Sequence, residues 1–276
     1  MEIDNKHYNN LFETLYCENK SGFSMSALHT HNFYELYFLH SGSRNYIINN
    51  KVYDLEGGCF ALIPPHVFHK TFGNNSHQRT LISFSKQYLN MFFQEEISEK
   101  MLSCFHSPLI HLDESELKLA DTYLKELLHT SAEYGYDKRP LVLASLLTLL
   151  NSHTIQSEGH PISASCQLLS QILDYITQNF LEIETLDQLA QTFFISKFHL
   201  CRIFKKFTGL SVIQYINILK LQLACKLLTE SNLSITEIGM ECGFNSQIYF
   251  CKIFKNNYGI SPSQYRRNPT QTISKQ

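Results

Sequence analysis

Residues 196–215 read SKFHLCRIFKKFTGLSVIQY, and residues 246–265 read SQIYFCKIFKNNYGISPSQY. Both stretches contain an Ile-Phe-Lys triplet, a glycine and a Gln-Tyr pair at the same spacing. A second match lies upstream, where residues 186–190 (LDQLA) correspond to residues 235–239 (ITEIG). The C-terminal part of the chain therefore contains two copies of one supersecondary unit.

Each copy carries the sequence signals of short helices joined by a turn. A Ser or Thr followed three residues later by Glu or Gln is a capping box that opens a helix, and Thr185 and Ser234 stand at such positions. A second helix is predicted from Ser196 and from Ser246, and each is followed by a glycine that can adopt a positive φ. In the second helix, apolar residues recur at i, i+3, i+4 and i+7, which indicates one buried face.

The opposite face of this second helix is basic and polar in both copies. Two short helices joined by a tight turn, the second exposing such a face, describe a helix-turn-helix that reads the major groove of DNA. The alternative is that these charges merely solvate a helix surface, and the duplicated spacing argues against it. The exposed candidates are Lys197, Phe198, Arg202 and Lys205 in the first copy, and Gln247, Tyr249, Lys252 and Lys255 in the second.

The segment between the copies predicts a connecting helix at residues 211–230. At ~1.5 Å per residue this helix is ~30 Å long. Successive turns of the major groove on one face of DNA are ~34 Å apart. One chain is therefore able to place both recognition helices in adjacent segments of the groove.

The motifs from Ser196 through Gly209, then Gly243-Phe244, Phe254-Lys255 and Gly259-x-Ser261-Pro262-x-x-Tyr265, resemble the AraC/XylS family of bacterial transcriptional regulators. The resemblance implies a DNA-binding domain of seven helices at residues 166–270, which binds promoter DNA and often activates transcription through RNA polymerase. The chain departs from the family at Lys220, where Arg is usual, and at Gly239, where Ala is usual. The resemblance places base contacts at Phe198, Cys201, Arg202, Gln247, Ile248, Tyr249 and Lys252.

The charge of the chain divides unevenly along its 276 residues. Residues 1–165 carry 12 Lys and Arg against 18 Asp and Glu, a net charge of −6, whereas residues 166–276 carry 11 against 7, a net charge of +4. This asymmetry predicts different partners for the two halves, so the overall net charge of −2 does not exclude a nucleic-acid binder. We predict a sensor domain at residues 1–155, a linker at 156–165 and the DNA-binding domain at 166–270.

The sequence also predicts a cytoplasmic protein with no membrane partner. No signal peptide is visible, and no apolar run approaches the ~20 residues that span a bilayer. The eight cysteines are scattered singly with no Cys-x-x-Cys pair, which is typical of reduced thiols.

Residues 22–84 show the glycines and alternating patterns of a strand-rich domain. Odd-numbered residues of the stretch HTHNFYELY (29–37) would share one face of an extended strand. The patterns His-x-His-x3-Glu-x6-Gly and Gly-x5-Pro-x4-His resemble the two motifs of a cupin barrel. The resemblance implies that a divalent transition metal such as Mn, Fe, Ni or Zn binds His29, His31, Glu35 and His69.

Three interpretations of this polar cluster remain open. In the first, the cluster binds a metal ion. In the second, the cluster lines a pocket for a small-molecule effector together with Tyr37 and Tyr46. In the third, the histidines are structural and are satisfied by hydrogen bonds within the protein. His66 replaces the Gly of the second motif, and Gly73 stands where Asn is expected. Effectors in the AraC/XylS family include sugars, which makes a sugar the effector class implied by the resemblance.

Two helices are predicted after the barrel, at residues 116–129 and 141–150. The second is apolar on nearly all sides and must be covered, either by the barrel or by a second subunit. The resemblance favours a homodimer contact here, with Leu146 in the contact.

The predicted fold class is α+β multidomain: an N-terminal cupin-like β-barrel with a helical hairpin, and an all-α C-terminal domain with two helix-turn-helix units. The predicted function is a sequence-specific DNA-binding transcriptional regulator, not an enzyme, controlled by a small-molecule effector. The alternatives are a metal-dependent cupin enzyme tethered to a DNA-binding or localisation module, and a DNA-binding protein that responds to no ligand.

Overall fold

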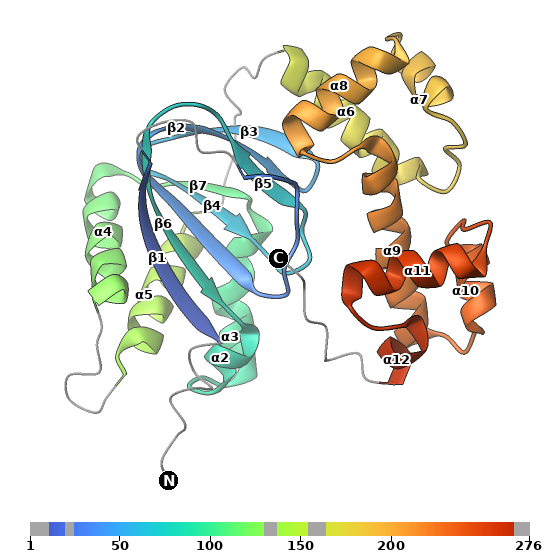
Figure 1. Cartoon of the computed structure of the whole chain (residues 1–276). Helices are drawn as coiled ribbons and strands as arrows, with labels where there is room; N and C mark the ends of the chain where they lie inside the picture. Colours follow the sequence, from blue (N-terminus) through green and yellow to red (C-terminus); the bar gives the residue numbers. More distant parts are fainter. Residues whose placement is uncertain (1–10, 20–24, 130–136, 154–163, 268–276) are drawn as a thin grey trace. The chain divides into compact units, whose positions relative to one another are not determined.

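The computed structural model describes residues 11–19, 25–129, 137–153 and 164–267. The chain divides into two compact units, Met1–Ser163 and Ala164–Gln276 (Figure 1). The predicted linker at 156–165 falls almost entirely outside the described residues. No helix in the described ranges is long and apolar enough to cross a lipid bilayer.

The first unit is built on an antiparallel sheet in the order β1-β6-β2-β4-β7, with β3 and β5 pairing the far half of β2. β2 is long because one half pairs with β4 and β6 and the other half with β3 and β5, which folds the sheet over itself. A register shift between Leu39 and Ser41 marks the bend. The strands are β1 (Phe12–Asn19), β2 (Tyr34–Ile48), β3 (Lys51–Glu56), β4 (Cys59–Ile63), β5 (His69–Phe72), β6 (His77–Phe84) and β7 (Leu109–His111).

The turn between β2 and β3 is a two-residue hairpin loop. Asn49 and Asn50 adopt φ values of 47° and 69°. Two successive positive φ angles define the turn whose twist matches that of antiparallel strands, and Asn tolerates this conformation.

Alternate residues of β2 enter two different cores, as a period of two requires. Leu36 and Phe38 face the helices and join a large core with α4 and α5. Tyr37 and Leu39 face the interior of the folded sheet, together with Tyr46. The helices of this unit are α2 (Lys86–Asn90), α3 (Glu95–Leu102), the 3₁₀ turn η1 (Ser103–His106), α4 (Glu114–His129) and α5 (Arg139–Asn151).

The expectation for Leu146 is wrong. This residue is fully buried in the core between α5 and the sheet, so it is covered by its own subunit. Because α5 is apolar on nearly all sides, its sequence does not predict which side packs against the sheet. The side of the helix pair that remains open carries Leu119 and Leu141, which are 43% and 50% exposed.

Over its described residues, 164–267, the second unit is helical, and the capping signals mark where the helices begin. The side chains of Thr185, Ser196, Ser211, Ser234 and Ser246 each accept a hydrogen bond from the backbone N–H three residues later. The helices are α6 (Ala164–Asn179), α7 (Leu186–Thr192), α8 (Lys197–Thr208), α9 (Val212–Glu230), α10 (Ile235–Glu241), α11 (Gln247–Tyr258) and α12 (Pro262–Arg267).

Candidate DNA interface and candidate effector site

Helices α8 and α11 are the second helices of the two repeated units. Each begins after a serine cap and ends at a glycine with φ of 78°, Gly209 and Gly259. Leu200 and Phe204 on α8, like Phe250 and Phe254 on α11, are buried under the first helix of their unit or under α9. The opposite faces are therefore free to enter a groove of DNA.

The residues predicted to contact DNA lie on these free faces. Phe198 and Ile248 are 76% and 82% exposed, unusual values for large apolar side chains in a folded domain. Cys201 is half-buried, so it presents less surface than its neighbours. The remaining predicted contacts, all exposed, are Lys197, Arg202, Lys205, Gln247, Tyr249, Lys252 and Lys255.

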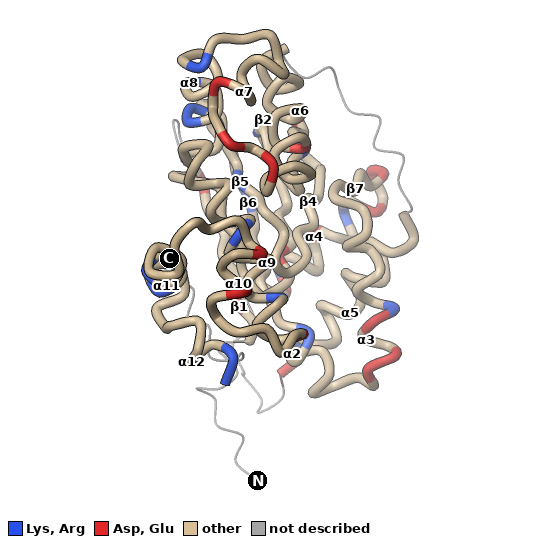
Figure 2. The backbone as a smooth tube through the Cα atoms, turned by 90° about the vertical axis from the view of Figure 1, so that its right-hand side faces the viewer, with Lys and Arg blue, Asp and Glu red and all other residues tan. Residues whose placement is uncertain are grey.

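Lys and Arg residues occur on each of α8, α11 and α12, where the backbone is blue in Figure 2. The Arg202 Nη2 lies 3.1 Å from the Nδ1 of His199, and its guanidinium lies 6.0 Å from the ring centroid of Phe198. These contacts hold Arg202 along the exposed face. The Nζ of Lys197 pairs with Asp187 at 2.7 Å, so a DNA phosphate must compete with that carboxylate for Lys197.

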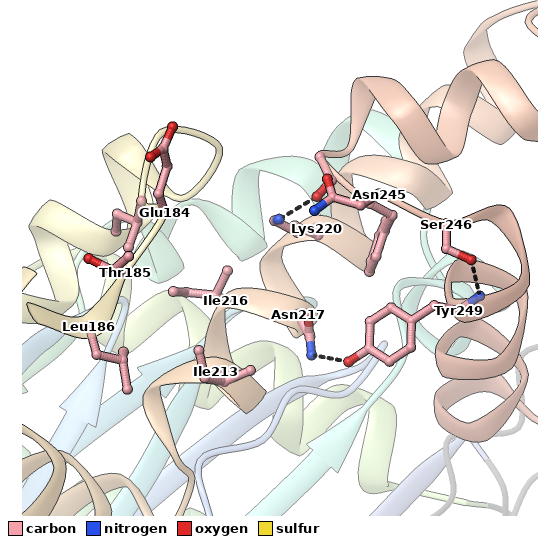
Figure 3. Close-up of a pocket in the computed structure, with 13 residues that line it drawn as sticks. Glu184, Thr185, Leu186, Ile213, Ile216, Asn217, Lys220, Asn245, Ser246 and Tyr249 are labelled. Carbon is pink, nitrogen blue, oxygen red and sulfur yellow. Dashed lines mark hydrogen bonds between the residues drawn. The ribbon is translucent and has the colours of Figure 1, made fainter. Parts of the chain in front are cut away.

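A groove of about 380 Å³ separates the start of α7 from the turn before α11, with α9 as its floor (Figure 3). At its α11 side, the Asn217 Nδ2 donates to the Tyr249 hydroxyl at 3.3 Å. The Nζ of Lys220 donates to the carbonyl of Gly243 at 2.6 Å and lies 5.6 Å from the Phe244 ring centroid. Lys220 and Asn217 thus tie the second helix-turn-helix to the connecting helix.

Sequence reasoning identified Lys220 as a departure from the family but not its role. Gly243 has φ of 71°, and a Cβ there would approach the Lys220 Nζ to 3.0 Å. The glycine therefore lets the lysine reach the turn. The contact of Asn217 with Tyr249 joins residues 32 positions apart, and no local sequence pattern carries that information.

In the first unit, the three histidines of the cupin motifs come together. The nitrogen ligand atoms of His29, His31 and His69 lie within 4.8 Å of one another. His29 and His69 are adjacent because their backbones form a two-way hydrogen-bonded bridge, at 3.2 and 3.0 Å. The Glu35 carboxylate faces the cluster, with its oxygens 3.5 Å from the His31 Nε2 and 3.9 Å from the His69 Nε2.

The expected single strand from His29 to Tyr37 is not observed. β2 begins at Tyr34, and the chain bends at residues 32 and 33. The His31 ring stacks on the Phe33 ring with centroids 3.8 Å apart. His29 and His31 therefore lie before the start of β2 and not within the strand. Glu35 and Tyr37 lie on β2 and do share a face.

Hydrogen bonds orient the histidine rings toward the centre of the cluster. The Nδ1 of His31 lies 2.9 Å from the carbonyl oxygen of Phe33, and the Nδ1 of His69 lies 2.9 Å from that of Val67. Since a carbonyl oxygen accepts only, each Nδ1 carries a proton, and in the neutral form of the ring the Nε2 presents a lone pair. This arrangement is the one that metal-binding histidines require.

Burial sets the protonation of these groups. Burial lowers the pKa of His69 to about 4, and it also lowers the pKa of His29. Burial alone would raise the pKa of Glu35, but the contacts with His31 and His69 hold it below its ordinary value. At neutral pH the lowered pKa values keep His29 and His69 neutral beside the Glu35 carboxylate, a donor set suited to a divalent transition metal.

Tyr46 connects the cluster to the interior of the folded sheet. Its hydroxyl donates to the Glu35 Oε1 at 3.1 Å, and its ring packs edge-on against Tyr37 with centroids 5.2 Å apart. Both rings are fully buried. All six residues predicted to line the pocket, His29, His31, Glu35, Tyr37, Tyr46 and His69, thus form one continuous group.

Comparison with known proteins extends to both units. A model of the AraC-like ligand binding domain matches residues 13–84, and a helix-turn-helix domain model matches residues 189–268. The transcriptional activator RhaR of Shigella dysenteriae is 26% identical over 250 residues, which cover 89% of this chain and 88% of RhaR. RhaR of Escherichia coli K12 shows the same identity and coverage.

Two solved structures are also similar. The C-terminal domain of AraT, a response regulator from Geobacillus stearothermophilus, is 32% identical, with a TM-score of 0.36, and covers 41% of this chain and 93% of its own. ToxT from Vibrio cholerae is 13% identical, with a TM-score of 0.38, over 94% of this chain and 98% of its own. Both domain models and the near full-length match to RhaR place the chain in the AraC/XylS family of DNA-binding transcriptional regulators.

Proposed function

We propose that this chain is a one-component transcriptional activator that reads DNA with α8 and α11 together. The observation that carries this proposal is the duplicated recognition helix, each copy with a buried apolar face and an exposed basic one. The 19-residue α9 spans ~28 Å, close to the ~34 Å between successive major-groove segments. Activation is what the name of RhaR states for that relative, and it implies RNA polymerase as a partner.

Effector binding in the first unit would shift the population of chain arrangements that engage DNA. The six residues His29, His31, Glu35, Tyr37, Tyr46 and His69 support this role because they gather polar side chains beside the apolar core inside the folded sheet. We assign the chain no enzymatic reaction and expect it to act in the cytoplasm.

Genome-wide mapping of bound DNA tests the proposal. We expect enrichment at a small number of promoters, with the bound sites containing two motifs about one helical turn apart. Uniform enrichment across the genome would contradict sequence-specific regulation. A reporter fused to a mapped promoter then separates activation from repression.

A metal ion at His29, His31, His69 and Glu35 is the second element of the proposal. It is supported by the convergence of the three histidines and by the lone pairs that His31 and His69 direct inward. When bound, the ion would supply a fixed positive charge against which an effector oxygen could be oriented.

Elemental analysis of the purified protein measures this directly. We expect close to one Mn, Fe, Ni or Zn ion per chain, and its loss in His31→Ala. His106→Ala is the matched control, because this exposed histidine belongs to the same unit but lies outside the cluster. Metal content well below one ion per chain, or unchanged in His31→Ala, would contradict the assignment.

A homodimer formed through α4 and α5 completes the proposal. These helices enclose a shallow groove of about 580 Å³ on the side away from the sheet. Its rim includes the exposed side chains of Leu119 and Leu141 beside the small residues Ala144 and Ser145. An apolar patch of this kind, bordered by polar residues, is typical of a subunit contact.

A further inference from the structure

The interior of the first unit buries more positive than negative charge. Among the described residues that are buried, Glu35 is the single carboxylate. Arg44 and Arg79 are only 2% and 7% exposed. Arg is among the residues least often buried without an ionic partner, and Arg44 is the one that raises this question here. Glu35 is already engaged by the histidine cluster and by Tyr46.

Both arginines lie on the inner face of the folded sheet. Arg44 is two residues before Tyr46 on β2, and side chains two apart on a strand share a face. Arg79 on β6 is paired in register with Leu39, which belongs to the inner core. The guanidinium of Arg79 lies 5.6 Å from the centroid of the Tyr37 ring.

Among the described residues, Arg44 contacts neutral oxygens, including the Tyr37 hydroxyl. Its Nη1 donates to the carbonyl of Gly73 at 2.7 Å, and its Nη2 donates to the Thr71 hydroxyl at 3.4 Å. Its Nε finds no hydrogen-bond partner among the described residues, and no described carboxylate forms an ion pair with it. These hydrogen bonds satisfy part of its donors but leave the positive charge without a counter-charge, which is costly at a buried site.

Gly73 explains how the guanidinium is held. This glycine stands where the cupin pattern has Asn, and it has φ of 135°, a conformation that favours glycine. A Cβ there would lie 3.5 Å from the Arg44 Nη1. That distance is an ordinary contact, so it is the backbone conformation that requires glycine here, and the glycine leaves no amide side chain beside the guanidinium.

The positive charge of Arg79 makes burial of the positive charge of Arg44 less favourable. Burial lowers the pKa of Arg44, and the nearby charge of Arg79 lowers it further. Burial raises the pKa of the Tyr37 hydroxyl, against the opposing effect of both arginines. Tyr37 therefore stays neutral and does not compensate the charge.

We propose that the effector of this protein carries an acid group, a carboxylate or a phosphate, that binds Arg44 inside the folded sheet beside Arg79 and Tyr37. Arginine suits this role because its planar donors match two oxygens of either group. The inference rests on the proposed function in that it assumes an effector in this unit. It specifies an acidic compound in place of a neutral sugar.

The experiment measures thermal unfolding of the full-length protein in chloride, acetate and inorganic phosphate at equal pH and ionic strength. We expect acetate or phosphate to raise the midpoint of the first unit's transition by several degrees over chloride. Stabilisation by acetate alone indicates a carboxylate, and stabilisation by phosphate alone indicates a phosphoryl group. The shift should disappear in Arg44→Gln and persist in Lys118→Gln, which removes an exposed cation from α4.

Arg44→Lys is a second variant in case Arg44→Gln fails to fold. It keeps the positive charge but loses the paired guanidinium donors. The rise in its unfolding midpoint caused by the anion should be less than half that of the wild type. No anion-specific shift in the wild-type protein, or an equal shift in Arg44→Gln or Arg44→Lys, would overturn the inference. DNA binding is measured on the same samples by mobility shift. If the wild-type protein shows no specific DNA binding, the proposed function is refuted. The effect of anions on the unfolding midpoint is a separate measurement and does not depend on that result.

Discussion

Phe194, in the turn between α7 and α8, is the residue whose conformation fits its sequence least well. It has φ of 54°, and its side chain is 98% exposed. In the second copy the same place in the turn is taken by Gly243, also with a positive φ. A non-glycine residue in this region costs about 1–2 kcal/mol, and an exposed ring recovers none of it by burial.

Phe194→Gly should therefore stabilise the second unit. We expect the free energy of unfolding in urea to rise by about 1 kcal/mol, less than the full strain because glycine also gains freedom in the unfolded chain. Phe194→Ala is the matched control, since it removes the ring but keeps the strained backbone, and its stability should be nearly unchanged. A Gly variant less stable than the wild type would show that the ring is packed against something.

At the scale of single elements, the recognition helices are where sequence reasoning reached furthest. Caps, glycine ends and the apolar period lie within each copy, so they predict α8 and α11 to within a residue or two. The buried Arg44, by contrast, depends on Gly73 and Thr71 from β5 and the loop after it. Such contacts form only when distant strands pair, and no local period reveals them.

The two recognition helices should contribute separately to DNA affinity. Arg202→Ala and Lys252→Ala are each expected to weaken specific binding by about 1–3 kcal/mol, because each removes a donor from the exposed face of its helix. Mobility-shift titrations against a mapped promoter measure this. Lys206→Ala serves as the control, since its Nζ lies over the Phe207 ring on another part of α8. An unchanged affinity in either of the first two variants would remove that helix from the interface.

The pair α4 and α5 carries a prediction about assembly. Leu141→Asp places a charge on the open side of the pair, where the wild-type leucine is 50% exposed, so it should leave the fold intact and yield monomers in sedimentation velocity. Leu15→Asp is the control, because Leu15 on β1 is equally exposed at 49% but lies elsewhere. If Leu141→Asp sediments as a dimer, the subunit contact lies on another surface.

At the scale of the whole molecule, the chain is two units with separate cores. The first unit has one core between sheet and helices and another inside the folded sheet, whereas a third core joins α9, α10 and α11. The acidic and basic parts of the sequence meet near the same boundary between the two units. The net charge of −2 for the whole chain therefore says little about what either unit binds. Control by an effector then requires that binding in the first unit alters how the second unit binds DNA.

Separate cores predict two transitions in calorimetric unfolding of the full chain. Leu147→Ala removes a fully buried side chain from the first unit, and Leu228→Ala removes one that is 2% exposed from the second. Each truncation costs about 2–5 kcal/mol and should lower only the transition of its own unit. A single transition, or a joint shift of both, would mean that the units fold cooperatively. With independent units, Leu147→Ala should still bind promoter DNA at a temperature where its sensor has begun to unfold, and should no longer respond to the effector there.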